Sequence, residues 1–521
     1  MIYGAAVSRR AWSIVITALI AFVLVGAGVI GSVRADDGLS RTSTVVDGVP
    51  LTVIRSVAAD PEPRPGAVVA HGFAGSARLM YAFGDTLARN GYVVVLPDFR
   101  GHGGSRQRLD IDALPADLDT AARFLRAQPG VDPGAIVLIG HSMGAGAVTR
   151  YAASHADIAA TVAISLPSAD DLPAAADRPR NLLLLYGGNE FPAFPAAARH
   201  ALAAPDPTGT YTLSRTYGDP ARGTARRADE VAGVEHISIL FADDTHRATL
   251  AWVNSVVRPA ASAGPVAPRA RLDAAGLILL GLLVGFYPVA ALLFRGPRAA
   301  GGLNWDVLGP GVGTTLFGAL VVGAVAPDSF LGLAVGGYST AVFAGFAAGG
   351  LAWLWRRGLP PVRRAILSSA PLDGVPMRAE LSIARAVVAG VGLTAYAAAT
   401  VAVPSHLGFT DNAPIPQRWW LLAVAAVGAA GVFLAAELLG GRTARGHALV
   451  LAVATLALTA LTMTGLGPGF TLLVLPLLVA LFVIQGAFAA ILRRFGAPAW
   501  VAAAVGAALL AWPVASTMPL V

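Results

Sequence analysis

The chain of 521 residues contains no cysteine, which excludes disulfide bonds, a thiolate nucleophile and cysteine metal ligands. Charge is also scarce: charged residues make up 13% of the chain, against about 25% in an average soluble domain, while hydrophobic residues reach 55%. Lysine is absent as well, and the arginines flank apolar runs instead of gathering in one basic domain. With a net charge of +7, this distribution indicates a membrane protein and argues against nucleic-acid binding.

The length exceeds what one hydrophobic core usually organises, so the chain is expected to form at least two structural units. Its first apolar stretch, Ala11 to Val33, is longer than the roughly 7–15 residues of a signal-peptide core and precedes no clean cleavage site. Residues 1–35 are therefore predicted to be a transmembrane anchor and residues 36–265 a water-soluble domain. Residues 266–521 are predicted to be a polytopic membrane domain of about eight helices.

After this soluble segment, apolar runs follow one another to the end of the chain, each near the roughly 20 residues that a helix needs to cross a bilayer. The predicted spans lie near residues 273–294, 306–326, 330–354, 384–403, 419–439, 447–464, 471–491 and 499–518. With the N-terminal anchor, they make nine predicted spans. Their many glycines and alanines are typical of closely packed membrane helices. Glu437 lies well inside an apolar run, and we interpret it as a helix-end carboxylate near the membrane edge.

The arginines alternate between the segments that connect the predicted spans. One set of segments carries clusters of them: Arg9 and Arg10, Arg295 and Arg298, Arg356, Arg357, Arg363 and Arg364, Arg442 and Arg445, and Arg493 and Arg494. The other segments carry few, and the exceptions are Arg34, Arg269, Arg271 and Arg418. Because loops rich in arginine stay in the cytoplasm, the amino terminus is predicted to be cytoplasmic. The water-soluble domain is then predicted to lie on the outer side of the plasma membrane.

The strongest motif lies in residues 135–144, where an apolar strand ends in Gly-His-Ser-Met-Gly and a helix of small residues follows. This order of strand, turn and helix is typical of a nucleophile elbow, whose sharp turn leaves no room for side chains at the two glycines. The motif predicts Ser142 as a nucleophile. It also predicts that the backbone N–H of Met143, at the helix start, stabilises an oxyanion.

Two upstream segments have related features. Residues 65–73 form an apolar strand that ends in His-Gly-Phe, and residues 92–105 form a strand followed by Asp-Phe-Arg-Gly-His-Gly. Together with the elbow, these segments resemble the α/β-hydrolase superfamily over roughly residues 42–258. The resemblance implies a mostly parallel sheet flanked by helices, next to an all-α transmembrane domain. It further implies that the N–H of Phe73 is the second oxyanion donor and that neither a metal nor an organic cofactor is needed.

The loop after the strand at residues 92–97 lies beside the predicted site and not in it, so Asp98, Arg100 and His102 are expected to be structural. For the base, the superfamily's order of Ser, acid and His along the chain restricts the choice among nine histidines. His236 is preferred because it lies in a short loop before a helix, where the family keeps its base. His246, expected within that helix, remains an alternative.

The acid is expected in the loop after the apolar strand at residues 181–186. Glu190 is preferred, because the Gly-Gly-Asn-Glu sequence there is similar to the family's pattern for this loop, and it would fix the tautomer of the base. The family more often has an aspartate at this position. Asp170 and Asp171, which follow the preceding strand, therefore remain alternatives.

Two loops bear on the substrate. Only about fifteen residues separate the strands at 161–165 and 181–186, too few for a large helical lid, so an open site is expected. The segment between Glu190 and His236 is longer and contains a β-like run at residues 210–217. It also carries a set of arginines that we interpret as a solvated basic face, with an anionic ligand as the alternative: Arg215, Arg222, Arg226 and Arg227.

The sequence thus predicts a membrane-integrated serine hydrolase that cleaves an ester or an amide through Ser142, His236 and Glu190. Its substrate is expected to be a small or lipid-like molecule, with membrane lipids around the helices. Two alternatives remain. One is an acyltransferase acting on an envelope lipid or glycan, and the other is a transporter or scaffold that uses the hydrolase fold only for binding.

Overall fold

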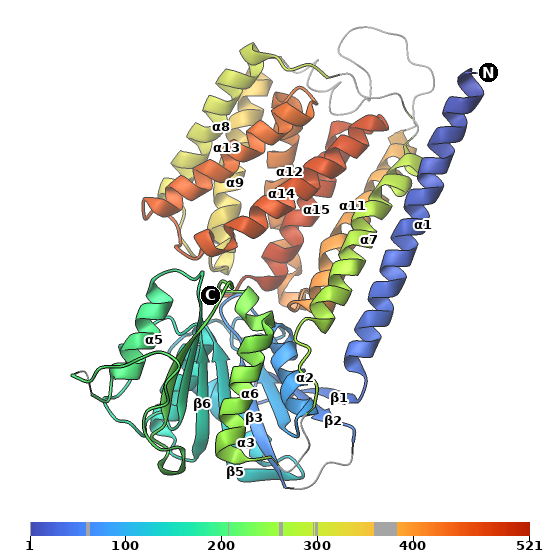
Figure 1. The fold of residues 1–521 in the computed structure, drawn as a ribbon. Coiled ribbons are helices and arrows are strands. Elements are labelled where there is room, and N and C mark those ends of the chain that lie inside the picture. Colours follow the sequence, from blue (N-terminus) through green and yellow to red (C-terminus); the bar gives the residue numbers. More distant parts are fainter. Residues whose placement is uncertain are drawn as a thin grey trace.

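A computed structural model describes residues 2–58, 63–206, 208–259, 264–294, 296, 301–358 and 383–521. It has two parts, a sheet flanked by helices and a layer of long helices that lies against one end of it (Figure 1). The predicted loop arginines Arg295, Arg298, Arg363 and Arg364 lie outside the described residues.

The sheet contains eight strands within the described residues, in the spatial order β1-β2-β4-β3-β5-β6-β7-β8. The strands are β1 (Leu39–Val46), β2 (Val49–Ser56), β3 (Arg64–Ala70), β4 (Val93–Pro97), β5 (Val131–His141), β6 (Ile158–Ile164), β7 (Leu182–Gly187) and β8 (Arg226–Val231). Strand β2 pairs antiparallel with β1 and β4, and all other pairs are parallel. The prediction of a mostly parallel sheet is confirmed.

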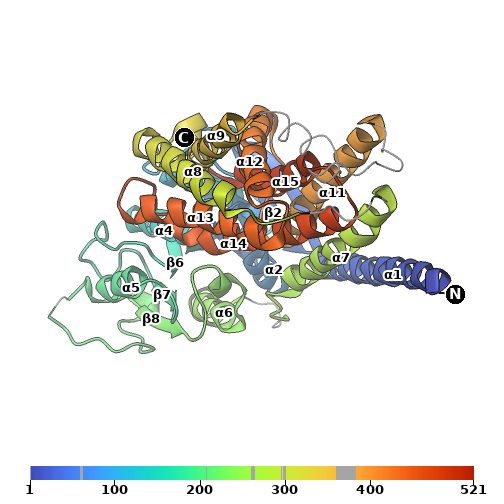
Figure 2. The same ribbon diagram turned by 90° about the horizontal axis from the view of Figure 1, so that it is seen from above.

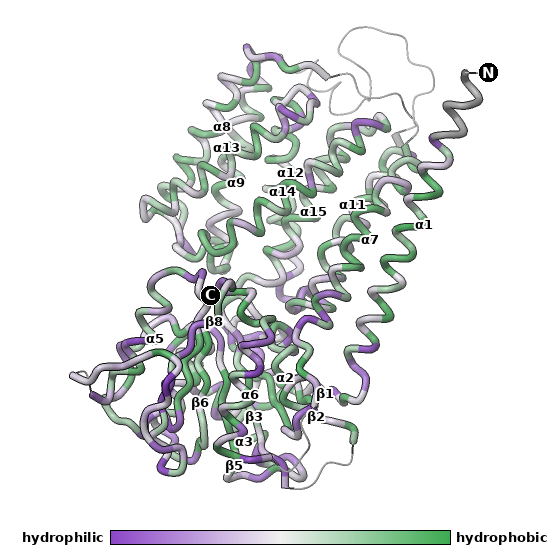
Figure 3. The backbone as a smooth tube through the Cα atoms, viewed as in Figure 1, coloured by the Kyte–Doolittle hydropathy of each residue, from purple (hydrophilic) through white to green (hydrophobic). Residues whose placement is uncertain are grey.

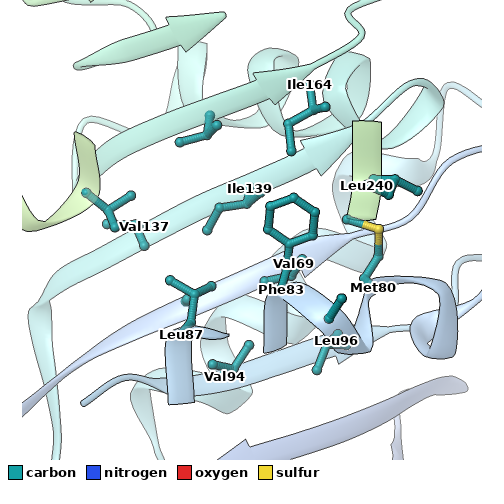
Figure 4. Close-up of a cluster of buried hydrophobic side chains, with 14 of the residues drawn as sticks. Val69, Met80, Phe83, Leu87, Val94, Leu96, Val137, Ile139, Ile164 and Leu240 are labelled. Carbon is teal, nitrogen blue, oxygen red and sulfur yellow. The ribbon is translucent and has the colours of Figure 1, made fainter. Parts of the chain in front are cut away.

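Helices cover both faces of this sheet. They are α2 (Tyr81–Arg89), α3 (Leu114–Arg126), α4 (Met143–Ser154), α5 (Ala193–Ala203) and α6 (Asp243–Val257). On one face, Phe83 of α2 packs over Val69 and Ile139 of the central strands (Figure 4). Alternate residues of the same strands, such as Val68, face α3 and α4 on the other side. Because both faces are buried, these strands are nearly all apolar, which is why their runs stand out in the sequence.

The predicted β-like run at residues 210–217 is not a strand. Its chain turns on itself, since the hydroxyl of Tyr217 accepts the N–H of Thr212 at 2.8 Å and the ring of Tyr217 packs on that of Tyr211. It meets β8 through an isolated bridge between Tyr217 and Arg226 and through the N–H of Ser214, which donates to the carbonyl oxygen of Ala228 at 2.8 Å. The strand that pairs with β7 at this edge of the sheet is β8, which follows the run in the chain.

The long helices form the second part. The first is α1 (Ile2–Asp36), and the others are α7 (Ala270–Leu293), α8 (Trp305–Val325), α9 (Gly336–Arg356), α11 (Ile383–Gly408), α12 (Trp419–Leu439), α13 (Ala444–Met463), α14 (Thr471–Arg494) and α15 (Ala499–Thr517). Seen from above, α1 lies at the edge of this layer beside α7 (Figure 2). Hydrophobic residues cover most of the length of these helices (Figure 3).

Eight helices in the described ranges are long and apolar enough to cross a membrane: α1, α7, α8, α11, α12, α13, α14 and α15. The ninth predicted span, at residues 330–354, does not qualify. It forms α9, which begins only at Gly336, because the preceding turn holds Leu331 and Val335 at positive φ. Five glycines in α9 lower its mean hydropathy, but they allow close packing: a Cβ on Gly345 would lie 2.5 Å from the carbonyl oxygen of Gly318 in α8.

Glu437 lies in the last turn of α12, as predicted, but its side chain has partners that the sequence did not indicate. Its buried side chain pairs with Arg493 of α14, and His447 Nδ1 of α13 lies 3.0 Å from Glu437 Oε1. His447 Nε2 in turn donates to Gln485 Oε1 at 2.6 Å. These partners come from other helices, and a carboxylate that is buried needs such partners.

Two arginines that depart from the predicted charge pattern lie where the two parts meet. Arg271, at the start of α7, pairs with Asp85 of α2 and Asp36 of α1. Arg418, which precedes α12, is fully buried and donates to the backbone carbonyl oxygens of Gly101, Ala515 and Met518. Both guanidinium groups therefore hold the sheet domain against the helices.

Candidate active site

Ser142 lies in a sharp turn between β5 and α4, with φ of 54° and ψ of −119°. The two glycines of the motif are needed because the backbone packs closely here. A Cβ on Gly140 would lie 2.3 Å from the carbonyl oxygen of Gly144, and a Cβ on Gly144 would lie 2.5 Å from that of His71. Such a strained turn projects the serine side chain from the sheet edge.

The side chain of His236 joins Ser142 to Glu190. His236 follows β8, its Nε2 lies 3.0 Å from Ser142 Oγ, and its Nδ1 lies 2.6 Å from Glu190 Oε1. A carboxylate can only accept, so Nδ1 carries the proton that it donates to Glu190. Nε2 is then free to accept the hydroxyl proton of Ser142, which is the arrangement of an activated serine.

The second carboxylate oxygen of Glu190, which does not contact His236, also has a hydrogen-bond partner. Its Oε2 accepts the backbone N–H of Gly187, at the end of β7, at 2.8 Å. The alternative acids lie elsewhere: Asp170 is exposed and accepts the hydroxyl of Ser168, and Asp171 is exposed too. The structure therefore brings Glu190 to His236, and neither Asp170 nor Asp171.

The alternative base, His246, is not near Ser142. It lies buried in α6, where its Nε2 donates to the carbonyl oxygen of Leu240 at 2.8 Å and its Nδ1 accepts the hydroxyl of Thr86 at 3.0 Å. Burial lowers the pKa of His246 to about 4. Its ring stacks on Phe83, so its role is in packing.

The predicted oxyanion donors flank Ser142. Met143 is the first residue of α4, so its N–H has no acceptor within the helix and lies at the positive end of the helix dipole. Phe73 follows Gly72, and a Cβ on Gly72 would lie 3.1 Å from Ser142 Cβ. The loop that carries Phe73 therefore passes directly beside the serine.

The loop after β4 supports this region. Asp98 accepts the backbone N–H groups of Ala77 and Gly104 at 2.7 and 2.9 Å, and burial raises its pKa to about 6. Arg100 forms a salt bridge with Asp117 of α3. These contacts fit the structural roles expected for the loop.

Sequence reasoning overlooked His141. Its Nε2 donates to the backbone carbonyl oxygen of His236 at 2.9 Å, and burial lowers the pKa of His141 well below its usual value. The neutral ring thus ties the loop of His236 to the elbow of Ser142. The only signal was its position between Gly140 and Ser142, which the motif leaves free.

The helical part reaches the loop of Phe73 from two sides, which no local pattern indicated. The ring of Phe73 packs on that of Phe470, just before α14, at a centroid distance of 4.6 Å. Ser76 Oγ lies 3.0 Å from Thr410 Oγ1 and accepts the backbone N–H of Asp411 at 2.8 Å. No helix lies between β6 and β7, as predicted, and Ser142 itself is half-buried.

The four arginines between Glu190 and His236 that were singled out in the sequence do not gather into one basic face. Arg226 is buried and donates to the backbone carbonyl oxygens of Ala175, Arg178 and Ala201. The other three are exposed or half-buried and have separate partners: Arg215 lies on the ring of Tyr217, Arg222 pairs with Asp219, and Arg227 pairs with Asp229. Among the residues with described positions, no group of three His, Asp or Glu side chains is placed to hold a metal ion.

Comparison with known proteins finds similarity over part of this domain. The α/β hydrolase fold family matches residues 68–222. The quorum-quenching protein AidA of Acinetobacter baumannii is 34% identical over 103 residues, 19% of this chain and 34% of AidA. The uncharacterized protein Rv2307c of Mycobacterium tuberculosis is 36% identical over 81 residues, 16% of this chain and 29% of Rv2307c. The chain thus spans about a third of the length of these relatives.

Two solved structures are similar to the sheet domain. A putative dienelactone hydrolase from Klebsiella pneumoniae has 20% sequence identity and a TM-score of 0.33, covering 42% of this chain and 99% of its own. XC6422 from Xanthomonas campestris, described as a serine hydrolase without lid, has 21% identity and a TM-score of 0.33, covering 43% and 97%. The family match and the sheet topology agree, so this chain contains an α/β-hydrolase domain, followed by a C-terminal region of long apolar helices.

Proposed function

We propose that this protein is a serine hydrolase that cleaves a carboxylic ester through an acyl-enzyme formed on Ser142. The observation that carries the proposal is the hydrogen-bonded series from Ser142 Oγ through His236 to Glu190, at 3.0 and 2.6 Å. A histidine held between a strained serine and a buried carboxylate is the arrangement by which enzymes make a hydroxyl nucleophilic.

Each residue has one task in the reaction. His236 Nε2 takes the proton of Ser142 as the hydroxyl oxygen attacks the ester carbonyl. The N–H groups of Phe73 and Met143 donate to the oxyanion that forms, and Glu190 stabilises the imidazolium. His236 then gives the proton to the leaving alcohol, and water, activated by the same imidazole, releases the acid and restores the serine.

The proposed location is the plasma membrane, with the hydrolase domain on its outer side. The arginine-rich ends of several helices gather away from the sheet domain: Arg10 of α1 lies over the ring of Phe495, just after α14, and Arg494 lies over Tyr287 of α7. The sheet domain begins at the opposite end of α1 (Figure 1). By the positive-inside rule, the end with the arginines is cytoplasmic.

The test is covalent labelling of the full chain with a fluorophosphonate, together with hydrolysis of p-nitrophenyl acetate. Wild type should label and hydrolyse, whereas Ser142→Ala should do neither. Because the chain has no cysteine, no thiol competes for the probe. Labelling that persists in Ser142→Ala would show that another residue is the nucleophile.

A further inference from the structure

The ring of Phe73 lies where the hydrolase domain meets the apolar helices. It packs edge-on against His102 and against Phe470, at centroid distances of 5.8 and 4.6 Å. Phe470 belongs to the loop at residues 464–470, which joins α13 to α14. The residue proposed to bind the oxyanion through its N–H thus has an apolar contact with the loop between two helices that are long and apolar enough to span a membrane.

Apolar side chains are also exposed directly beside the triad. Phe191, which follows Glu190, is 54% exposed, and Ile237, which follows His236, is 37% exposed. The ring of Phe194 packs on the ring of His236, at a centroid distance of 4.5 Å. Large apolar groups that are exposed beside a reactive centre indicate that the site receives an apolar ligand or faces lipid.

Apolar side chains are exposed on α13, on α14 and in the loop between them as well. Met463, at the end of α13, is 74% exposed, and Leu466 in the following loop is exposed too. On α14, Leu477 and Val483 are exposed in the same way. An acyl chain that leaves the site past Phe470 therefore meets apolar side chains along the connection between α13 and α14 and then the hydrocarbon of the bilayer.

We propose that the substrate is an ester with a long acyl chain that is dissolved in the membrane. Its chain lies against Phe73 and Phe470 and remains partly in the leaflet on the hydrolase side, while its carbonyl carbon reaches Ser142. This proposal rests on the proposed function, since it assigns the substrate class of the same site. Phe470 acts here through apolar contact with the chain and takes no part in proton transfer.

The chain-length dependence of hydrolysis tests this assignment. The full chain in detergent is given p-nitrophenyl esters from acetate to decanoate. Each methylene that leaves water on binding raises kcat/KM by up to about fourfold. Wild type should therefore prefer long chains, with the gain mostly in KM. Phe470→Ser should flatten this dependence and lower kcat/KM for the decanoate at least about tenfold, with a smaller loss for the acetate.

Matched variants separate this effect from a loss of folding. Phe470→Leu keeps an apolar side chain and should restore the preference for long chains. Phe317→Ser removes a phenylalanine that is 70% exposed on α8 and should leave the dependence unchanged. Phe191→Ser, at an exposed position beside Glu190, should flatten the dependence if Phe470→Ser does not fold.

A second experiment tests whether the enzyme takes the ester from the bilayer or from the surrounding solution. In nanodiscs that contain the enzyme and a fluorogenic dodecanoate ester, the rate should follow the mole fraction of ester in the bilayer. A rate that follows bulk concentration overturns a membrane source. A flat dependence in wild type, or one that neither Phe470→Ser nor Phe191→Ser changes, overturns the acyl site. Failure of wild type to label or to hydrolyse any ester would instead refute the proposed function.

Discussion

The hydroxyl oxygens of Ser76 and Thr410 lie 3.0 Å apart, although 334 positions separate the two residues in the chain. Ser76 ends the loop that begins with Gly72 and Phe73, and Thr410 lies between α11 and α12. The same hydroxyl of Ser76 accepts the N–H of Asp411, and Arg78 Nη1 donates to the carbonyl oxygen of His406 at 3.1 Å. The helical region thus contacts the loop that carries a proposed oxyanion donor.

Ser76→Ala is expected to lower kcat about tenfold with little change in KM, because an oxyanion donor that is misplaced weakens the transition state more than substrate binding. Ser76→Thr, which keeps a hydroxyl, should recover part of the rate. Steady-state kinetics on the full chain measure both, with Ser168→Ala in an exposed loop as the control. An unchanged kcat in Ser76→Ala would show that the contact serves only to join the two parts.

His236→Ala should lower turnover by about three orders of magnitude, because it removes the group that accepts the proton of Ser142. His246→Ala should leave the turnover of the folded protein nearly unchanged and lower its melting temperature, since His246 is buried and bonded to Thr86 and Leu240. Kinetics and thermal unfolding of the two variants check this. The opposite ranking of the two turnover numbers would move the base to His246.

Glu190→Gln should lower kcat by about three orders of magnitude, because the amide can donate to Nδ1 and so favours the tautomer that cannot accept the proton of Ser142. Asp170→Asn and Asp171→Asn are controls of the same chemistry at exposed positions. They should change kcat less than twofold. A larger loss in either control than in Glu190→Gln would contradict the geometry of the site.

Stability is expected to fall as pH is lowered from about 6.5 to 4. Burial lowers the pKa of His71 and His246 to about 4. In that window the unfolded chain binds protons that the folded chain does not, which costs at most about 3 kcal/mol for each histidine. Asp98, whose pKa is raised to about 6, works in the opposite direction between pH 6 and 4.

The two histidines outweigh the one aspartate, so the melting temperature should decrease with acid. Thermal unfolding of the full chain in detergent between pH 7.5 and 5 measures it. His246→Gln should melt lower at pH 7.5 but show a shallower decrease, because one titrating group is gone. A melting temperature that rises toward pH 5 would contradict the burial of these imidazoles.

Topology can be tested with single thiols, since the natural chain has none. Cysteines at Ser43 and Ala413, both exposed on the hydrolase side, should react with a membrane-impermeant maleimide in intact cells. A cysteine at Ala444, exposed beside Arg445, should react only after lysis. Labelling of Ala444→Cys but not Ser43→Cys in intact cells would invert the orientation.

The sequence by itself determined the parts that depend on neighbouring residues. The elbow at Ser142 was readable because its two glycines are dictated by backbone contacts within a few residues or with the adjacent strand. The central strands and the apolar helices were readable because burial on all sides requires continuous apolar runs. The loops of His236 and Glu190 were readable from their places after apolar runs and from the resemblance to a family.

The tertiary structure alone decided which distant groups meet. Glu190 was separated from Asp170 and Asp171 only when β7 and β8 brought it within 2.6 Å of His236. The partners of Glu437 and the contact of Phe73 with Phe470 lie on other helices. Periodicity and local motifs describe how one segment is buried, but such pairs depend on how whole helices pack against one another and against the sheet, and no local pattern encodes that arrangement.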